Sequence, residues 1–350
     1  LEGDKLHDTL AAHTEFVVGV VHEIEEARWG PRADRWREDV SDDYGNISAV
    51  LERAVEADDA DTLGRIVGDL NVWWYRMGRH AEGRRWINAA LAGIDQLDDA
   101  QRCRVLLAAG FMALADQRID FARTHYRGAI EAADAAGDWR YAQFARANLT
   151  ATELTEPERF DEALERIDAV IAAAQERREL AVLAHGLNVA GVLLHRHGHH
   201  EDSERRLLEA VAVNDEIGDR YQKSMNLGNL GLLLISKGSS AEALAYCRDS
   251  LLLSWRIGSQ VMSAWLIDEI AHLLLLLGEH AVAARLLGTT EAVLASLGTH
   301  HGPTALQSMY ADTVAGLRTE LGDDRFDEML AEGRQTTLES AVELALSTTP

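Results

Sequence analysis

Four histidines crowd one short stretch of the chain, where they could bind a metal ion. They are His195, His197, His199 and His200, and they lie on either side of Gly198. Imidazole is a good ligand for zinc and nickel. The glycine, however, predicts a turn between two helices, in which the four side chains need not share a face. We therefore interpret the cluster as a solvated turn and expect no metal site.

A second group with possible chemistry consists of Asp268, Glu269 and His272, which lie within about one helical turn of each other. A carboxylate beside an imidazole can act as a general acid/base pair. The pattern supplies neither a nucleophile nor a metal partner for such a pair. We therefore interpret these side chains as the polar wall of a groove and expect a protein that is not an enzyme.

The segment from Gly218 to Ser224 is the nearest match to a phosphate-binding loop. Such a loop needs a glycine-rich turn whose backbone N–H groups face the phosphates and a lysine that reaches them. The segment is one residue too short, and Gln222 stands where the second glycine belongs. We therefore expect neither a nucleotide nor another cofactor.

The charge balance disfavours further classes of function. Among 350 residues, 34 are Lys or Arg and 58 are Asp or Glu, which gives a formal charge of −24. Such a charge repels nucleic acid and anionic lipid. The apolar runs are far shorter than the roughly 20 residues of a membrane span, and the two separate cysteines form neither a disulfide framework nor a zinc motif. The composition thus indicates a cytoplasmic protein that binds neither nucleic acid nor a membrane.

An internal repeat is the strongest organising feature of the sequence. Glycines recur at multiples of 40 residues, with two other residues in the gaps. The positions are Gly78, Arg118, Glu158, Gly198, Gly238 and Gly278. A fixed period of this length is typical of a helical repeat protein. A second column, five residues on, consists of the small residues Gly83, Ala163, Ser203, Ala243 and Ala283. We expect small residues to recur where two helices touch.

Within one unit, small and bulky residues follow a fixed order. It runs through Gly191, Ser203, Leu207 and Ala210, and the next unit repeats it 40 residues later from Gly231. These offsets match the tetratricopeptide pattern, in which two antiparallel helices pack through small side chains, although that repeat has only about 34 residues. Glycines at 137, 218 and 258 indicate the helix stops between units.

The sequence therefore predicts an all-α, tetratricopeptide-like solenoid of helical hairpins. We expect about six repeats of period 40 over residues 59–298, an N-terminal helical cap over 1–58 and a C-terminal cap over 299–350. The first cap has a break at Gly30-Pro31 and the second has breaks at Gly322 and Gly333. End helices with a polar outer face stop such an array from growing.

Aromatic side chains gather in the first repeat. They are Trp73, Trp74, Tyr75 and Trp86. Aromatic bulk of this kind more often seals a core than stacks on a base. We expect these side chains to pack against the preceding helices.

Several motifs resemble a known family. Residues 43–47, 73–75 and 82–86 look like the helical region that follows the nucleotide-binding module in actinobacterial signal-transduction ATPases with numerous domains, and residues 284–288 and 332–334 look like its closing segment. LuxR-type and antibiotic-regulatory-protein-type transcription regulators contain the same region. The resemblance implies an arm that senses an inducer or partner and releases an autoinhibited ATPase. We expect the ATPase and DNA-binding modules of such a parent chain to lie outside these 350 residues.

In tetratricopeptide arrays the first helix of each unit lines the concave face, which forms the groove. Counting from the small residue of each unit predicts a mixed polar and aromatic groove. Its residues are Arg104, Phe111, Asn148, Thr152, His185, Asn188, His195, Met225, Asn229, Trp265, Asp268, Glu269 and His272. Carboxamides can both donate to and accept from a peptide main chain. Alternatively, these amides cap turns or bond neighbouring helices.

Two functions agree with this reading of the sequence. The first is a non-enzymatic sensing arm of a bacterial signalling ATPase or transcription regulator, which binds a peptide, a small molecule or a protein partner in its concave groove. The second is a stand-alone protein-interaction scaffold without a ligand switch. The residues do not identify the ligand.

Overall fold

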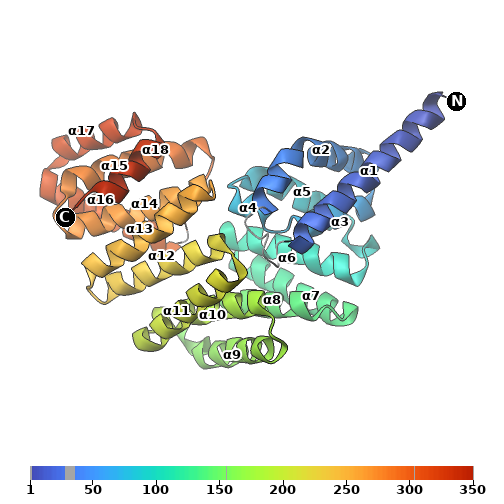
Figure 1. Cartoon of the computed structure of the whole chain (residues 1–350), viewed down its shortest axis with the longest axis horizontal. Coiled ribbons are helices and arrows are strands. Elements are labelled where there is room, and N and C mark those ends of the chain that lie inside the picture. The colour runs from blue at the N-terminus through green and yellow to red at the C-terminus, as the bar shows by residue number, and fades with distance from the viewer. Residues whose placement is uncertain (1, 28–35, 155, 303, 350) are drawn as a thin grey trace. The chain divides into compact units, whose positions relative to one another are not determined.

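The computed structural model describes residues 2–27, 36–154, 156–302 and 304–349, and every regular element in them is a helix (Figure 1). The prediction of an all-α, tetratricopeptide-like solenoid is confirmed. The predicted break at Gly30-Pro31 lies outside the described residues. The helices are α1 Glu2–Ala27, α2 Trp36–Glu56, α3 Ala60–Asp69, α4 Trp73–Arg76, α5 His80–Ala92, α6 Asp99–Ala115, α7 Ile119–Ala136, α8 Trp139–Ala151, α9 Phe160–Arg177, α10 Leu180–Arg196, α11 His200–Ile217, α12 Arg220–Ser236, α13 Ser240–Arg256, α14 Gln260–Leu276, α15 His280–Ser296, α16 Thr304–Leu321, α17 Asp323–Arg334 and α18 Leu338–Ser347, with short 3-10 helices at Ile94–Gln96 and Pro157–Arg159.

The helices from α6 to α15 alternate as the first and second helices of successive hairpins. The chain forms two compact units. The first comprises residues 1–75, 80–186 and 216–218, and the second comprises residues 76–79, 187–215 and 219–350. The predicted limits of the repeat region fall between helices, with residue 58 after α2 and residue 298 after α15. No helix in the described part of the chain is long and apolar enough to cross a membrane.

The glycine column of period 40 lies at the turns of the hairpins. Gly198, Gly238 and Gly278 have φ between 75° and 89°, and a Cβ atom at any of the three would meet nothing within 4 Å. They turn the chain between the two helices of a hairpin, because glycine adopts the left-handed conformation without steric cost. The small residues of the second column lie between helices instead, and Ala163, Ser203, Ala243 and Ala283 are fully buried. The helix stops expected at residues 137, 218 and 258 are confirmed, since these glycines also have positive φ.

Two other residues adopt the left-handed conformation where the repeat has lost its glycine. Gln117 has φ 59° and Arg178, which ends α9, has φ 58°. This conformation costs a residue with a Cβ about 1 kcal/mol or more. We expect Arg178→Gly, at an exposed position, to raise the free energy of unfolding by about 1 kcal/mol, measured by thermal melting. Gln175→Gly, inside the last turn of α9, is the control and should lower it by about 1 kcal/mol. Equal destabilisation by both variants would contradict the assignment.

Small residues within the helices do mark the contacts between them, as the order within each unit predicts. A Cβ atom at Gly191 of α10 would lie 2.7 Å from Cγ of Leu207 on α11. Ser203 Oγ donates a hydrogen bond to the carbonyl oxygen of Gly191 over 2.8 Å. One repeat later, a Cβ atom at Gly231 would overlap the sulfur of Cys247. The two helices of a hairpin therefore approach closely where one of them has no side chain.

The aromatic residues of the first repeat form a sealed core, as expected. Trp73, Trp74 and Trp86 are at most 1% exposed. Trp73 stacks on Tyr44 of α2 with ring centroids 4.7 Å apart, and Nε1 of Trp74 donates to the Tyr44 hydroxyl over 2.8 Å. Tyr75 is half-buried and stacks on the ring of His80.

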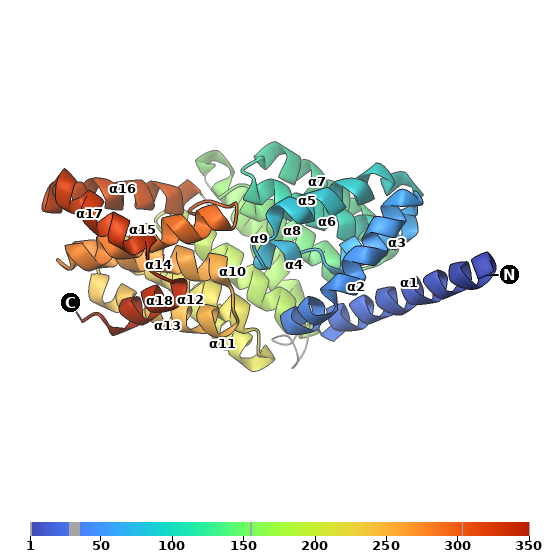
Figure 2. The same cartoon turned by 90° about the horizontal axis from the view of Figure 1, so that it is seen from above.

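At the C-terminal end, α17 and α18 pack against α15 (Figure 2). Gly322, with φ 76°, separates α16 from α17, as predicted. The break expected at Gly333 is also found, because α17 ends at Arg334 and α18 begins at Leu338. Gly333 itself lies where the backbones of α15 and α17 meet.

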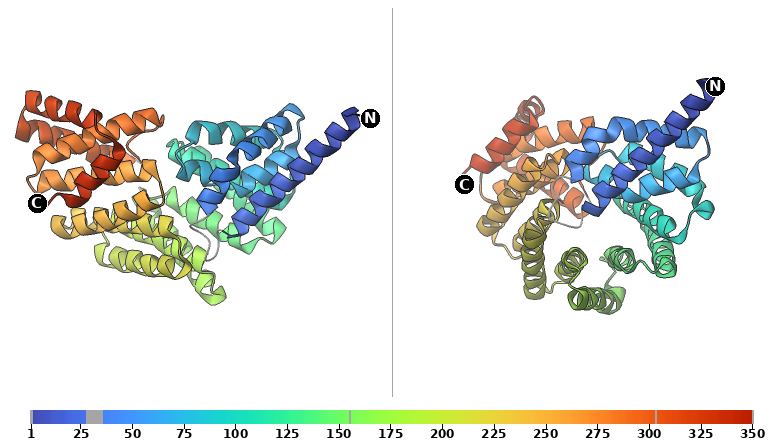
Figure 3. Two further views of the ribbon diagram at one scale, coloured as in Figure 1. Left: turned by 45° about the horizontal axis from the view of Figure 1, so that its top comes forward. Right: turned by 45° about the vertical axis from the view of Figure 1, so that its right-hand side comes forward.

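At the N-terminal end, α1 packs against α2 and α3 through its second half. Val17, Val18 and Val21 are at most 3% exposed. Residues 5–12 are exposed, and Figures 1 and 3 show the first turns of α1 projecting beyond α2 and α3.

Candidate functional site

The predicted groove residues all lie on the first helices of the hairpins or, for Thr152, at the end of one. Five are in the first compact unit and eight are in the second. They are Arg104 and Phe111 on α6, Asn148 on α8, Thr152 after α8, His185, Asn188 and His195 on α10, Met225 and Asn229 on α12, and Trp265, Asp268, Glu269 and His272 on α14.

In the first compact unit, polar side chains join successive first helices. Nη1 of Arg104 on α6 donates to Oδ1 of Asp69 on α3 over 2.6 Å. Nε2 of His185 on α10 lies 2.9 Å from Oδ1 of Asn148 on α8, so two predicted groove residues bond to each other here. Phe111 packs edge-to-face on Tyr126. These contacts bind neighbouring helices to each other.

The second compact unit has the same kind of contacts. Asn188 on α10 donates to Oδ1 of Asn226 on α12. Nδ1 of His272 lies 2.9 Å from Oγ1 of Thr313 on α16, and Nε1 of Trp265 donates to the carbonyl oxygen of His300 over 2.9 Å. Asn188 and Asn148 therefore bond neighbouring helices, which is the alternative to a ligand-binding role.

Sequence reasoning missed the partners in these bonds. Each partner lies 35 to 41 residues from the predicted residue, about one repeat away. The period of the repeat was thus the pattern that could have identified them. The missed partners are Asp69, Asn226, Ser236 and Thr313.

Four predicted groove residues are buried in the packing, namely Asn148, Thr152, Asp268 and Glu269. Asp268 is 2% exposed and Glu269 is 4% exposed. Oδ2 of Asp268 lies 2.6 Å from Nδ1 of His301, and the sulfur of Cys247 on α13 lies 3.6 Å from Oε2 of Glu269. Burial raises the pKa of both carboxyls, that of Glu269 to about 8. Thr152 is also buried, and its hydroxyl donates to the carbonyl oxygen of Leu149. These residues are packed between helices, whereas the sequence predicted them at the wall of a groove.

The four histidines do lie at a turn, because α10 ends at Arg196 and α11 begins at His200. Nε2 of His195 lies 2.9 Å from Oγ of Ser236, and the His195 ring is 5.8 Å from that of His200. Burial, with smaller effects of Arg196 and His200, lowers the pKa of His195 to about 4. His195 and His200 are half-buried, so the turn is less solvated than expected. Among the described residues, no three His, Cys, Asp or Glu side chains are arranged to hold a metal.

One part of the first-helix face remains available to a ligand. Asn188, Met225 and Asn229 are half-buried, and we call them the α10–α12 surface. Met225 and Asn229 share a face of α12 because they are four residues apart. The Asn229 carboxamide makes no hydrogen bond to another described residue. Its donor and acceptor are therefore available for an external partner.

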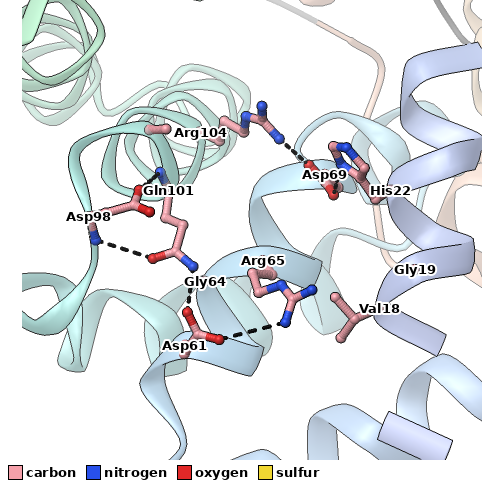
Figure 4. Close-up of a pocket in the computed structure, with 11 residues that line it drawn as sticks. Val18, Gly19, His22, Asp61, Gly64, Arg65, Asp69, Asp98, Gln101 and Arg104 are labelled. Atoms are coloured by element: carbon pink, nitrogen blue, oxygen red, sulfur yellow. Dashed lines mark hydrogen bonds and ion pairs between the residues drawn. The ribbon is translucent and has the colours of Figure 1, made fainter. Parts of the chain in front are cut away.

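A pocket of about 410 Å³ in the first compact unit was not predicted. It lies between α1, α3 and the start of α6, and Arg104 is the one predicted groove residue that lines it (Figure 4). His22, Asp61, Arg65 and Asp69 supply most of its charged groups. Because α1 lies outside the repeat, the repeat pattern gives no indication of this pocket.

Comparisons with known proteins identify the fold of the chain. No family model and no curated protein matches it. The solved structure of a Rap protein complexed with Competence and Sporulation Factor is 13% identical, with a TM-score of 0.61, and the match covers 95% of this chain and 99% of that chain. The apo form of the quorum sensor NprR from B. thuringiensis is 15% identical, with a TM-score of 0.45 and coverage of 94% and 97%. At 13% identity, the Rap match shows a shared fold alone.

Proposed function

We propose that this chain is a non-enzymatic sensor that binds a peptide on its α10–α12 surface. Asn229 carries the proposal, because its half-buried carboxamide makes no hydrogen bond to the other described residues, whereas Asn188 is already bonded to Asn226. A carboxamide can donate to a peptide carbonyl and accept from a peptide N–H at the same time. Met225 offers the peptide a flexible apolar contact.

The fold likeness supports this proposal. The Rap protein of the same fold was solved with Competence and Sporulation Factor bound. In this chain, the carboxylates that could imitate an acid/base pair, Asp268 and Glu269, are enclosed between helices and cannot reach a substrate. The chemistry that remains on the first-helix face is hydrogen bonding, which is sufficient for recognition.

The cellular role that we propose follows from the resemblance in sequence. The chain acts as the sensing arm of a cytoplasmic signalling ATPase or LuxR-type transcription regulator, and peptide binding changes the activity of a module in the same parent chain. A stand-alone scaffold would bind its partner without such a change. Adding the peptide to the full-length parent and measuring ATP hydrolysis or promoter binding distinguishes the two.

The binding itself is testable with peptides selected from a random linear library on the intact chain. We expect Asn229→Ala to weaken the selected peptide about 2- to 12-fold, because one hydrogen bond contributes about 0.5–1.5 kcal/mol. Calorimetry measures the affinity. The melting temperature should not change, since the Asn229 side chain makes no hydrogen bond to the other described residues.

Glu209→Ala is the control, because Glu209 is exposed on the second helix α11. It should leave both affinity and melting temperature unchanged. An Asn229→Ala variant that binds normally, or a selection that yields no peptide, would remove the support for the α10–α12 surface.

A further inference from the structure

The pocket between α1, α3 and α6 has the size of a small-ligand site. Its volume of about 410 Å³ lies within the range of about 300–1,000 Å³ typical of such pockets. Its uncharged lining includes small residues, namely Val18, Gly19, Gly64 and Ala100. A Cβ atom at Gly19 would meet nothing within 4 Å. The wall therefore leaves room for a short apolar group.

The two arginines of the pocket are already paired. Arg104 binds Asp69 over 2.6 Å, and Asp69 also lies 3.2 Å from Nδ1 of His22. Arg65 is shared between Glu15 at 3.3 Å and Asp61 at 3.7 Å. An anionic ligand would have to compete with these carboxylates for both cations.

Carboxylates, by contrast, are in excess around the pocket. Asp61, Asp69 and Asp98 line it together with two arginines. The Gln101 side chain makes hydrogen bonds to both Asp61 and Asp98, as Figure 4 shows. Its Nε2 donates to Asp61 over 2.7 Å, and its Oε1 accepts from the backbone N–H of Asp98 over 3.1 Å. The side chain of Asp61 is 65% exposed, so its carboxylate remains accessible.

We propose that this pocket binds an organic cation, an alkylammonium or alkylguanidinium group. Asp61 and Asp98 receive the positive charge, and the small residues around Gly19 contact the aliphatic stem. The chain's charge of −24 attracts the same class of ligand over longer range. The site shares no residue with the α10–α12 surface, so it is separate from the proposed peptide site.

Two glycine variants test the pocket by filling it. Gly19→Leu adds a bulky side chain at a position that lines the pocket, without a steric conflict at its Cβ atom. Gly45→Leu is the matched control, because Gly45 is an exposed helical glycine of α2 that also has nothing within 4 Å of its Cβ position and does not line the pocket. Both variants should melt at or above the temperature of the unmodified chain, since each replaces a helical glycine.

The probes for calorimetry are agmatine, the capped tripeptide acetyl-Ala-Arg-Ala-amide and its citrulline analogue. We expect the guanidinium probes to bind saturably, the uncharged citrulline analogue to bind at least tenfold more weakly, and Gly19→Leu, but not Gly45→Leu, to lose at least tenfold in affinity. Asp61→Asn should weaken the cationic probes about fivefold. Binding of agmatine alone indicates a free small cation, whereas binding of both cationic probes indicates a basic side chain, and either result supports the site.

Three results would overturn this assignment. They are the absence of binding by both cationic probes, equal affinity for the citrulline analogue, and an unchanged affinity in Gly19→Leu. Loss of peptide binding in Asn229→Ala bears on the other site alone, so the two proposals fail independently.

Discussion

Gly333→Ala is expected to destabilise the second compact unit by about 3 kcal/mol or more, because the new methyl group has no room. A Cβ atom there would overlap the carbonyl oxygen of Arg285 on α15, and a Cβ atom at Gly288 would overlap that of Leu330 on α17. Both obstacles are backbone atoms, which cannot move aside as the end of a side chain can. The two helices would have to separate. This separation would disrupt the packing of Phe326 and Met329, which are each 1% exposed.

Thermal melting followed by circular dichroism measures this effect. Gly45→Ala is the control, because that helical glycine has open space around it, and it should be neutral or stabilising by up to about 1 kcal/mol. A Gly333→Ala variant with the same melting temperature as the unmodified chain would show that α15 and α17 do not cross at these glycines.

Raising the pH from 6 to 9 is expected to destabilise the protein through Glu269. Burial, with a smaller contribution from the nearby Asp268, raises the pKa of this carboxyl to about 8 against the lowering effect of the hydrogen bond from Cys247. In the unfolded chain the group already ionises near its ordinary value, about 4.3. Between the two values the folded state therefore binds one proton more, so stability falls as the pH rises and the loss ends once the pH passes about 8. From pH 6 the loss amounts to at most about 3 kcal/mol.

Glu269→Gln keeps the shape of the side chain and removes its titration. We expect this variant to lose less stability than the unmodified chain between pH 6 and pH 9, and to be the more stable of the two at pH 9. Urea unfolding at both pH values measures the difference. An equal loss of stability in the two proteins between pH 6 and pH 9 would mean that Glu269 ionises as readily in the folded chain as in the unfolded one.

The helical hairpins could be predicted from the sequence because the residues of each close contact recur with the period of the repeat. Gly191 and Leu207 meet, and one repeat later Gly231 and Cys247 meet in the same way. The column of Gly198 and Gly238 has the same period for another reason, the turn of each hairpin. A period alone cannot distinguish a packing glycine from a turn glycine, because both recur once in every unit.

The candidate site was less predictable, because the repeat pattern identifies a helix face but not what covers it. Helix α14 packs against α13, α15, α16 and α18, so Asp268 and Glu269 are buried although they lie on a first helix. Asn188 and Asn229 both belong to the predicted groove, yet among the described residues only Asn188 has a hydrogen-bond partner, Asn226. Side-chain pairing between successive units decides which amide remains available.

The α10–α12 surface is tested most directly by a double-mutant cycle between Asn229→Ala and N-methylation of single peptide bonds in a selected peptide. N-methylation removes one main-chain donor, so the two changes should not add if the Asn229 carboxamide bonds that peptide group. We predict a coupling of about 1 kcal/mol at one peptide bond, about fivefold in affinity, and none with Glu209→Ala. Additive effects at every peptide bond would show that Asn229 does not bind the peptide main chain.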